Sequence, residues 1–127
     1  MSDGRILVIE DNFDNLELVR FLLENAGFTV IAAHDGLEGL SVARMVLPDL
    51  VLTDLTLPEI DGWSLAQQLK GDQLTMDIPV VALTAHTLPG DRQRALESGC
   101  DGYLSKPLDI PSFIPSIRHY LKRRQGS

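Results

Sequence analysis

Three carboxylates, a hydroxyl and an ammonium group each follow a short apolar stretch of this sequence. In chain order these side chains belong to Glu10, Asp11, Asp54, Thr84 and Lys106. Carboxylate oxygens are ligands that Mg²⁺ prefers, and Mg²⁺ commonly shares its site with phosphate. A carboxylate beside a cation and a lysine can carry out phosphoryl transfer, which depends on positioning and on stabilising negative charge.

Asp54 is the candidate nucleophile of this set, because a carboxylate can accept a phosphoryl group as an acyl phosphate. Glu10 and Asp11 would hold the metal, since crowded carboxylates repel each other unless a divalent cation lies among them. Lys106 would contact a phosphoryl oxygen as a point charge. The Thr84 hydroxyl would donate a hydrogen bond to a phosphoryl oxygen. The histidines are scattered along the chain and form no set at zinc spacing with the single cysteine.

The elements that must bring these groups together alternate along the chain. Apolar runs predict strands, and amphipathic segments predict helices. The predicted strands cover 5–10, 28–33, 49–53, 78–83 and 102–104, and the predicted helices cover 12–25, 35–46, 62–70, 89–98 and 109–124. Strands that are apolar on both faces indicate a parallel sheet covered by helices on both sides. We therefore predict a flavodoxin-like α/β fold, a (βα)5 three-layer sandwich with strand order 2-1-3-4-5.

This strand order makes neighbours of the strands that carry the five groups. In open α/β sheets, ligands bind beyond the carboxyl ends of the strands, where the strand order reverses. The sequence therefore predicts one pocket at that edge. The last helix carries a proline, Pro115, which cannot donate a hydrogen bond to the carbonyl of Pro111. We expect this helix to begin late, near Ser112, and to be weakened as a homodimer contact.

The composition limits the class of protein. A chain of 127 residues with 44% hydrophobic residues fits one globular domain, residues 1–127. The formal net charge of −7 disfavours nucleic-acid binding. We expect no signal peptide, because the apolar stretch after Arg5 is short and ends in acidic residues. No apolar run approaches the ~20 residues that span a bilayer. The single cysteine, Cys100, fits a reducing compartment. We expect a soluble cytoplasmic protein without membrane contact.

Short motifs along most of the chain, from Arg5 to Leu121, resemble the receiver domain of two-component response regulators, especially stand-alone regulators and hybrid-kinase receivers. The motifs are Glu10-Asp11, Asp54 with Pro58 and Gly62, Thr84-Ala85, and Lys106-Pro107. The resemblance implies a phosphorelay switch, not an enzyme, in which Asp54 accepts phosphate from a histidine kinase or a histidine phosphotransfer domain. It also implies a single receiver domain with no output domain, which signals to a downstream protein target.

The resemblance assigns further roles at the metal site. It implies that Asp11 and Asp54 bind Mg²⁺ directly and that Glu10 binds it through water. The backbone carbonyl of Thr56 would be a further ligand. In this reading the phosphoprotein assists its own phosphorylation and dephosphorylation.

The resemblance also implies a switch. Thr84 and Tyr103 would form the switch pair, with the ring turning inward when Thr84 moves to the phosphoryl group. The bond before Pro107 would be cis, which aims Lys106 into the pocket. The responding surface is expected on the helix at 89–98, the strand at 102–104 and the last helix, including Arg92, Tyr103 and Arg118.

Three other functions use the same fold or a similar acyl phosphate. A phosphatase of the haloacid-dehalogenase type resembles Asp-x-Asp, but here Thr56 stands where its second acid would be. A flavin-binding domain needs a phosphate loop rich in Ser, Thr and Gly after the first strand, whereas residues 11–15 are acidic and would repel phosphate. A pseudo-receiver that only scaffolds partners is disfavoured by the intact residue set.

Overall fold

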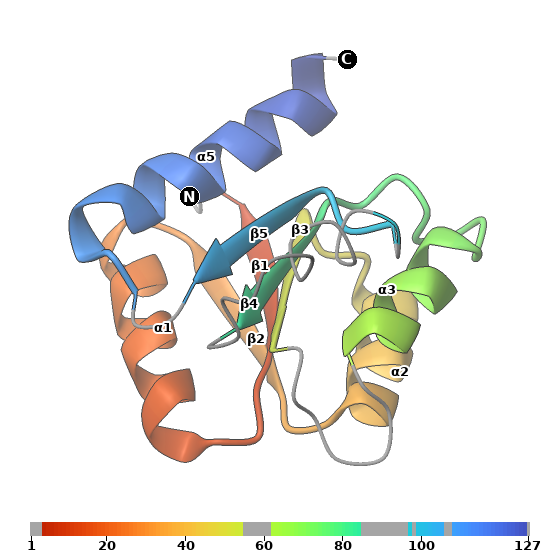
Figure 1. Ribbon diagram of the computed structural model, residues 1–127, viewed down its shortest axis with the longest axis horizontal. Coiled ribbons are helices and arrows are strands. Elements are labelled where there is room, and N and C mark those ends of the chain that lie inside the picture. Colours follow the sequence, from red (N-terminus) through yellow and green to blue (C-terminus); the bar gives the residue numbers. More distant parts are fainter. Residues whose placement is uncertain (1–3, 55–61, 85–96, 98, 106–107, 127) are drawn as a thin grey trace.

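Five parallel strands form a sheet in the order β2-β1-β3-β4-β5 in the computed structural model, which describes residues 4–54, 62–84, 97, 99–105 and 108–126. The strands are β1 (Arg5–Ile9), β2 (Thr29–Ala33), β3 (Leu50–Asp54), β4 (Val80–Thr84) and β5 (Gly102–Ser105). The described helices are α1 (Phe13–Asn25), α2 (Gly36–Val46), α3 (Gly62–Lys70) and α5 (Ile110–Gly126). Helices α1 and α5 cover one face of the sheet, and α2 and α3 cover the other (Figure 1). The predicted fold class and strand order are confirmed.

The strands are apolar on both faces because their side chains alternate between two cores. In β1, Leu7 and Ile9 belong to the core on the α2 and α3 side, while Ile6 and Val8 belong to the core on the α1 and α5 side. Every residue of β3 is buried. This burial on both faces explains why the strands appear in the sequence as continuous apolar runs.

The predicted elements agree with the described ones apart from a few residues at their ends. The fifth strand extends to Ser105, one residue beyond the prediction. Of the helix predicted at 89–98, the structure describes Glu97, which is helical, and the rest lies outside the described residues. Within the described part of the chain, no helix combines the length and the apolar character needed to cross a membrane.

The last helix begins earlier than the sequence suggested. Helix α5 starts at Ile110 and continues through the exposed Pro115, so the prediction of a start near Ser112 was wrong. A proline at this position removes one main-chain hydrogen bond, the one to the carbonyl of Pro111. The helix keeps three buried apolar side chains against the sheet, namely Phe113, Ile117 and Leu121. The burial of these side chains offsets the lost bond.

A half-buried ion pair joins the end of α3 to the beginnings of β4 and β5. Lys70 Nζ lies 2.6 Å from Asp101 Oδ2 and donates to the carbonyl of Ile78 at 2.8 Å. The same oxygen of Asp101 accepts the N–H of Val80 at 2.8 Å. Beside this junction, Cys100 is buried, and desolvation together with the nearby Asp101 charge raises the pKa of its thiol to about 11. The thiol is therefore protonated and unreactive at neutral pH.

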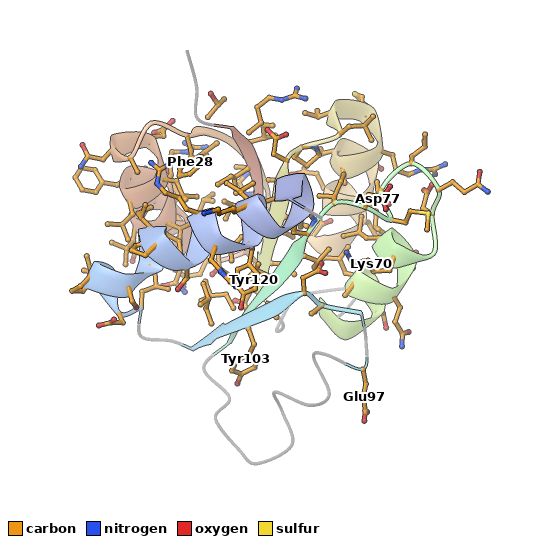
Figure 2. All side chains as sticks on the ribbon, turned by 90° about the horizontal axis from the view of Figure 1, so that it is seen from above. Phe28, Lys70, Asp77, Glu97, Tyr103 and Tyr120 are labelled. Atoms are coloured by element: carbon orange, nitrogen blue, oxygen red, sulfur yellow. The ribbon has the colours of Figure 1, made fainter. Side chains whose placement is uncertain are left out.

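Two glycines allow helices to approach the sheet closely. A Cβ atom at Gly39 of α2 would overlap the side chain of Ile9 in β1. A Cβ atom at Gly102 of β5 would overlap the ring of Tyr120 in α5. The Tyr120 ring lies at the face of β5 that α5 covers (Figure 2). A side chain at either position would force the facing side chain to move.

We expect Gly39→Ala to lower the free energy of unfolding by about 1–3 kcal/mol, because the new methyl group overpacks the core. At an unhindered helix position the same change would stabilise. Ile9→Val removes the Cδ1 atom that lies nearest the new methyl group. The double variant should therefore lose less stability than the sum of the two single variants. Urea denaturation of the four proteins measures this, and additive losses would contradict the proposed overlap.

Candidate functional site

The register of the sheet makes Glu10 and Asp54 neighbours. Ile9 of β1 pairs with Thr53 of β3, so the next residue of each segment lies at the same edge. Asp54 in turn pairs with Leu83 of β4. The strand order reverses between β1 and β3, which is where open α/β sheets bind ligands. The carboxyl ends of β1 and β3 lie together at the lower edge of the sheet in Figure 1.

Three carboxylates meet at this edge. One oxygen atom each of Glu10, Asp11 and Asp54 lies within 4.8 Å of the others. The Glu10 side chain is 2% exposed and Asp54 is 8% exposed, whereas Asp11 is open to solvent. Anionic carboxylates this close repel each other. A hard divalent cation among them would convert the repulsion into attraction, and the donor set of three carboxylates suits Mg²⁺.

Main-chain hydrogen bonds hold the first of these acids in place. The N–H of Glu10 donates to the carbonyl of Ala33 at 3.0 Å, which continues the ladder between β1 and β2. The Glu10 carboxylate accepts the N–H of Asn12 at 3.3 Å. The Asn12 side chain caps α1 by accepting the N–H of Asn15 at 3.0 Å. Asparagine before an amphipathic segment is a typical N-cap signal, so this role of Asn12 could have been predicted from the sequence.

Asp54 is fixed by the strand that carries it. It is the last residue of β3, whose residues are all buried. The hydroxyl of the fully buried Thr53 donates to the carbonyl of Asp54 at 3.0 Å. The hydroxyl thereby has the hydrogen-bond partner that a buried polar group requires. The candidate nucleophile is therefore carried by a rigid strand and not by a loop.

The structure describes only part of the remaining predicted site. Thr84 ends β4, and its main chain pairs with Ser105 of β5, but its side chain is not described. Thr56, Lys106 and Pro107 lie outside the described residues. The roles predicted for these residues therefore stay predictions.

The predicted switch residue Tyr103 lies on β5, next to the strand that ends in Thr84. Its side chain is half-buried and packs against the core on the α2 and α3 side. Figure 2 shows the ring pointing away from α5 and from Tyr120.

Arg118 of α5 contacts the segment between α1 and β2. Its guanidinium donates to the carbonyl of Ala26 at 3.0 Å and lies 4.9 Å from the centre of the Phe28 ring. These contacts join α5 to the corner between α1 and β2. Phe28 belongs to the core on the opposite face of the sheet from the core that Tyr103 contacts. Arg118 thus links α5 to the end of α1, a contact that local sequence patterns do not predict.

Comparisons with known proteins give a consistent result. Residues 6–118 match the family model of the response regulator receiver domain. The polar-differentiation response regulator DivK of Brucella ovis is 42% identical over 116 residues, which cover 91% of this chain and 94% of that protein. The signal receiver domain of a histidine kinase from Syntrophus aciditrophicus superimposes with a TM-score of 0.87 and 32% identity, covering 94% of this chain and 91% of that one.

A further solved structure contains a metal. The receiver domain of the sensor histidine kinase PA1611 from Pseudomonas aeruginosa superimposes with a TM-score of 0.83 and 31% identity, covering 98% of each chain. In that structure a magnesium ion is coordinated in the active-site cleft.

We expect Mg²⁺ to bind the acidic cluster, and Glu10→Gln or Asp11→Asn to weaken binding by about tenfold or more. Each change removes a negative charge from the group of carboxylates that attracts the ion. Asp14→Asn is the matched control, because Asp14 is an exposed acid in the first turn of α1 outside the cluster. Isothermal titration calorimetry measures the affinities. Equal weakening in Asp14→Asn would show attraction to an acidic surface and not coordination.

Proposed function

Because this chain belongs to the response regulator receiver domain family, we propose that Asp54 accepts a phosphoryl group from a phosphohistidine and thereby switches a protein-binding surface. The observation that carries the proposal is the meeting of three carboxylates within 4.8 Å where the strand order reverses. Glu10, Asp11, Asp54 and the carbonyl of Thr56 are the proposed holders of Mg²⁺. The protein would act in the cytoplasm as a phosphoacceptor and not as an enzyme with a diffusible substrate.

In the proposed transfer, a carboxylate oxygen of Asp54 attacks the phosphorus atom while the bond from phosphorus to the donor's imidazole nitrogen breaks. The electron pair of that bond remains on the nitrogen, which takes up a proton as the imidazole leaves. When bound, Mg²⁺ offsets the negative charge of the carboxylates and of the phosphoryl oxygens. Lys106 would stabilise the same oxygens. The rigid strand β3 supports the reaction because it positions the attacking oxygen in advance.

The proposed switch follows from the new charge on Asp54. A phosphoryl group changes the population of two states only through contacts that one state has and the other lacks. The Thr84 hydroxyl is the proposed donor to a phosphoryl oxygen. The half-buried Tyr103 on the neighbouring strand would fill the space that Thr84 leaves when it moves. A downstream protein would then recognise the altered surface around β5.

The donor protein must bring its histidine to Asp54, so its surface has to cover the carboxyl edge of the sheet and the beginning of α1. The outer face of α1 exposes large apolar side chains at this place, namely Phe13 at 71%, Leu18 at 43% and Phe21 at 64%. Phe13 follows the cap residue directly and lies two residues from Asp11. Exposed aromatic side chains are frequent anchors of protein interfaces. We therefore assign the outer face of α1 to contact with the phosphohistidine protein.

Incubation with acetyl phosphate and Mg²⁺ should add the mass of one phosphoryl group to the wild-type protein. Asp54→Asn should abolish the gain, because the amide cannot form the acyl phosphate. Asp77→Asn, at an exposed acid in the connection between α3 and β4, should leave it unchanged. Intact-protein mass spectrometry reads the result. An unmodified wild type, or a gain that survives Asp54→Asn, would disprove the proposed function.

Phe13→Ala combined with Phe21→Ala should slow phosphotransfer from a histidine kinase by roughly tenfold, because a lost interface anchor costs about 1–2 kcal/mol. The probe is the purified kinase of the source organism that phosphorylates the wild type fastest. The rate with acetyl phosphate should stay unchanged, since that small donor needs no protein contact. Met45→Ala is the control, because Met45 is 80% exposed on α2, on the other side of the sheet. A similar loss in Met45→Ala, or with acetyl phosphate, would refute docking on α1.

A further inference from the structure

Three residues connect the end of β1 at Ile9 to the start of α1 at Phe13. They are Glu10, Asp11 and Asn12, so the connection carries two of the three clustered acids. The first residue of the connection is held by its N–H bond to the carbonyl of Ala33 at 3.0 Å. The exposed Asp11 lies between this held residue and Asn12. The position of the Asp11 carboxylate therefore depends on how firmly Asn12 is held.

Asn12 makes hydrogen bonds in three directions. Its side-chain oxygen accepts the N–H of Asn15 at 3.0 Å, and its carbonyl accepts the N–H of Leu16 at 3.0 Å. Its own N–H donates to the carboxylate of Glu10 at 3.3 Å. The cap holds Asn12 in an extended conformation, with φ −91° and ψ 119°. In this conformation the N–H of Asn12 donates to Glu10, an acid of the cluster.

The beginning of α2 offers a comparison within the same chain. Asp35 caps α2 by accepting the N–H of Glu38 at 2.8 Å. The Glu38 carboxylate reaches back and accepts the N–H of His34 at 2.8 Å. The turn before α2 is thus closed by a carboxylate of its own helix. In the turn before α1, the accepting carboxylate is instead that of Glu10, which belongs to the candidate metal site. Of these two caps, only that of α1 is therefore connected to a proposed metal ligand.

We propose that Asn12 is a positioning residue of the metal site. Its side chain caps α1, and the cap fixes the main chain of Asn12. The fixed N–H then orients the Glu10 carboxylate. The fixed main chain also limits the movement of the preceding residue, Asp11. The inference rests on the proposed function, because it assigns Asn12 a role toward Mg²⁺. Groups that orient metal ligands without touching the ion commonly change metal affinity when they are replaced.

Asn12→Ala tests the inference, because alanine keeps the main-chain N–H and removes the cap. The expected result is an Mg²⁺ dissociation constant about tenfold higher, measured by isothermal titration calorimetry. Phosphorylation by acetyl phosphate should slow at limiting Mg²⁺ and return close to the wild-type rate at saturating Mg²⁺. Asn12→Ser, which supplies another strong cap, should keep an affinity within about twofold of the wild type.

Asp35→Ala provides the matched control, because it removes the cap of α2 and leaves the turn before α1 intact. Its urea midpoint should shift about as far as that of Asn12→Ala, while its Mg²⁺ affinity stays near the wild-type value. Asp35→Asn keeps a cap and removes the charge, which separates capping from electrostatics. Wild-type affinity in Asn12→Ala, or equal weakening in Asp35→Ala, would overturn the positioning role alone. A wild-type protein that binds no Mg²⁺ would overturn the proposed metal site as well.

Discussion

The mutual repulsion of Glu10, Asp11 and Asp54 is the constraint around which this domain is organised. In an unfolded chain Asp54 would move away from the adjacent Glu10 and Asp11, whereas the folded sheet holds one oxygen of each acid within 4.8 Å of the others. The force that opposes their repulsion is the burial of the strands that end beside them. Because Ile9 pairs with Thr53, a shift of one residue between β1 and β3 would both separate the acids and turn apolar side chains away from their cores. The same register therefore determines the site and the stability of the fold.

Helix α1 connects the site to the rest of the molecule. Its first turn is anchored by Asn12 at the acidic cluster, and its inner face packs into the core with α5. Its far end accepts the hydrogen bond from Arg118, whose guanidinium also covers Phe28. Helices α1 and α5 are thus fastened to each other as well as to the sheet.

The arrangement of strands and acids could be predicted because it depends on local patterns and one general rule. Buried parallel strands have continuous apolar runs, and their carboxyl ends meet at one edge of the sheet. The beginning of α5 could not be predicted in this way. Local sequence shows the hydrogen bond that Pro115 removes, but the packing of Phe113 and Ile117 against distant strands outweighs it.

The hydrogen-bond partners of individual polar groups could not be predicted from the sequence either. Arg118 meets Ala26 across 92 residues of chain, and only the folded topology brings the two together. The N–H of Asn12 meets a carboxylate two residues earlier, which depends on the angle at which the chain enters α1. Phe13 is an apolar residue at the first position of α1, yet it is 71% exposed. The first residue of a helix can lie beyond the edge of the core, even when its spacing matches that of the buried residues.

The burial of Cys100 has a practical consequence. With a thiol pKa of about 11, only about one molecule in ten thousand carries the thiolate at pH 7, and the side chain is shielded from solvent. Because the sequence has no other cysteine, the folded domain should resist mild oxidants and thiol-specific dyes. A cysteine introduced on the surface could then be labelled selectively without first removing the native one. Fluorescent or spin probes could thus report on movements of this domain while its native core stays intact.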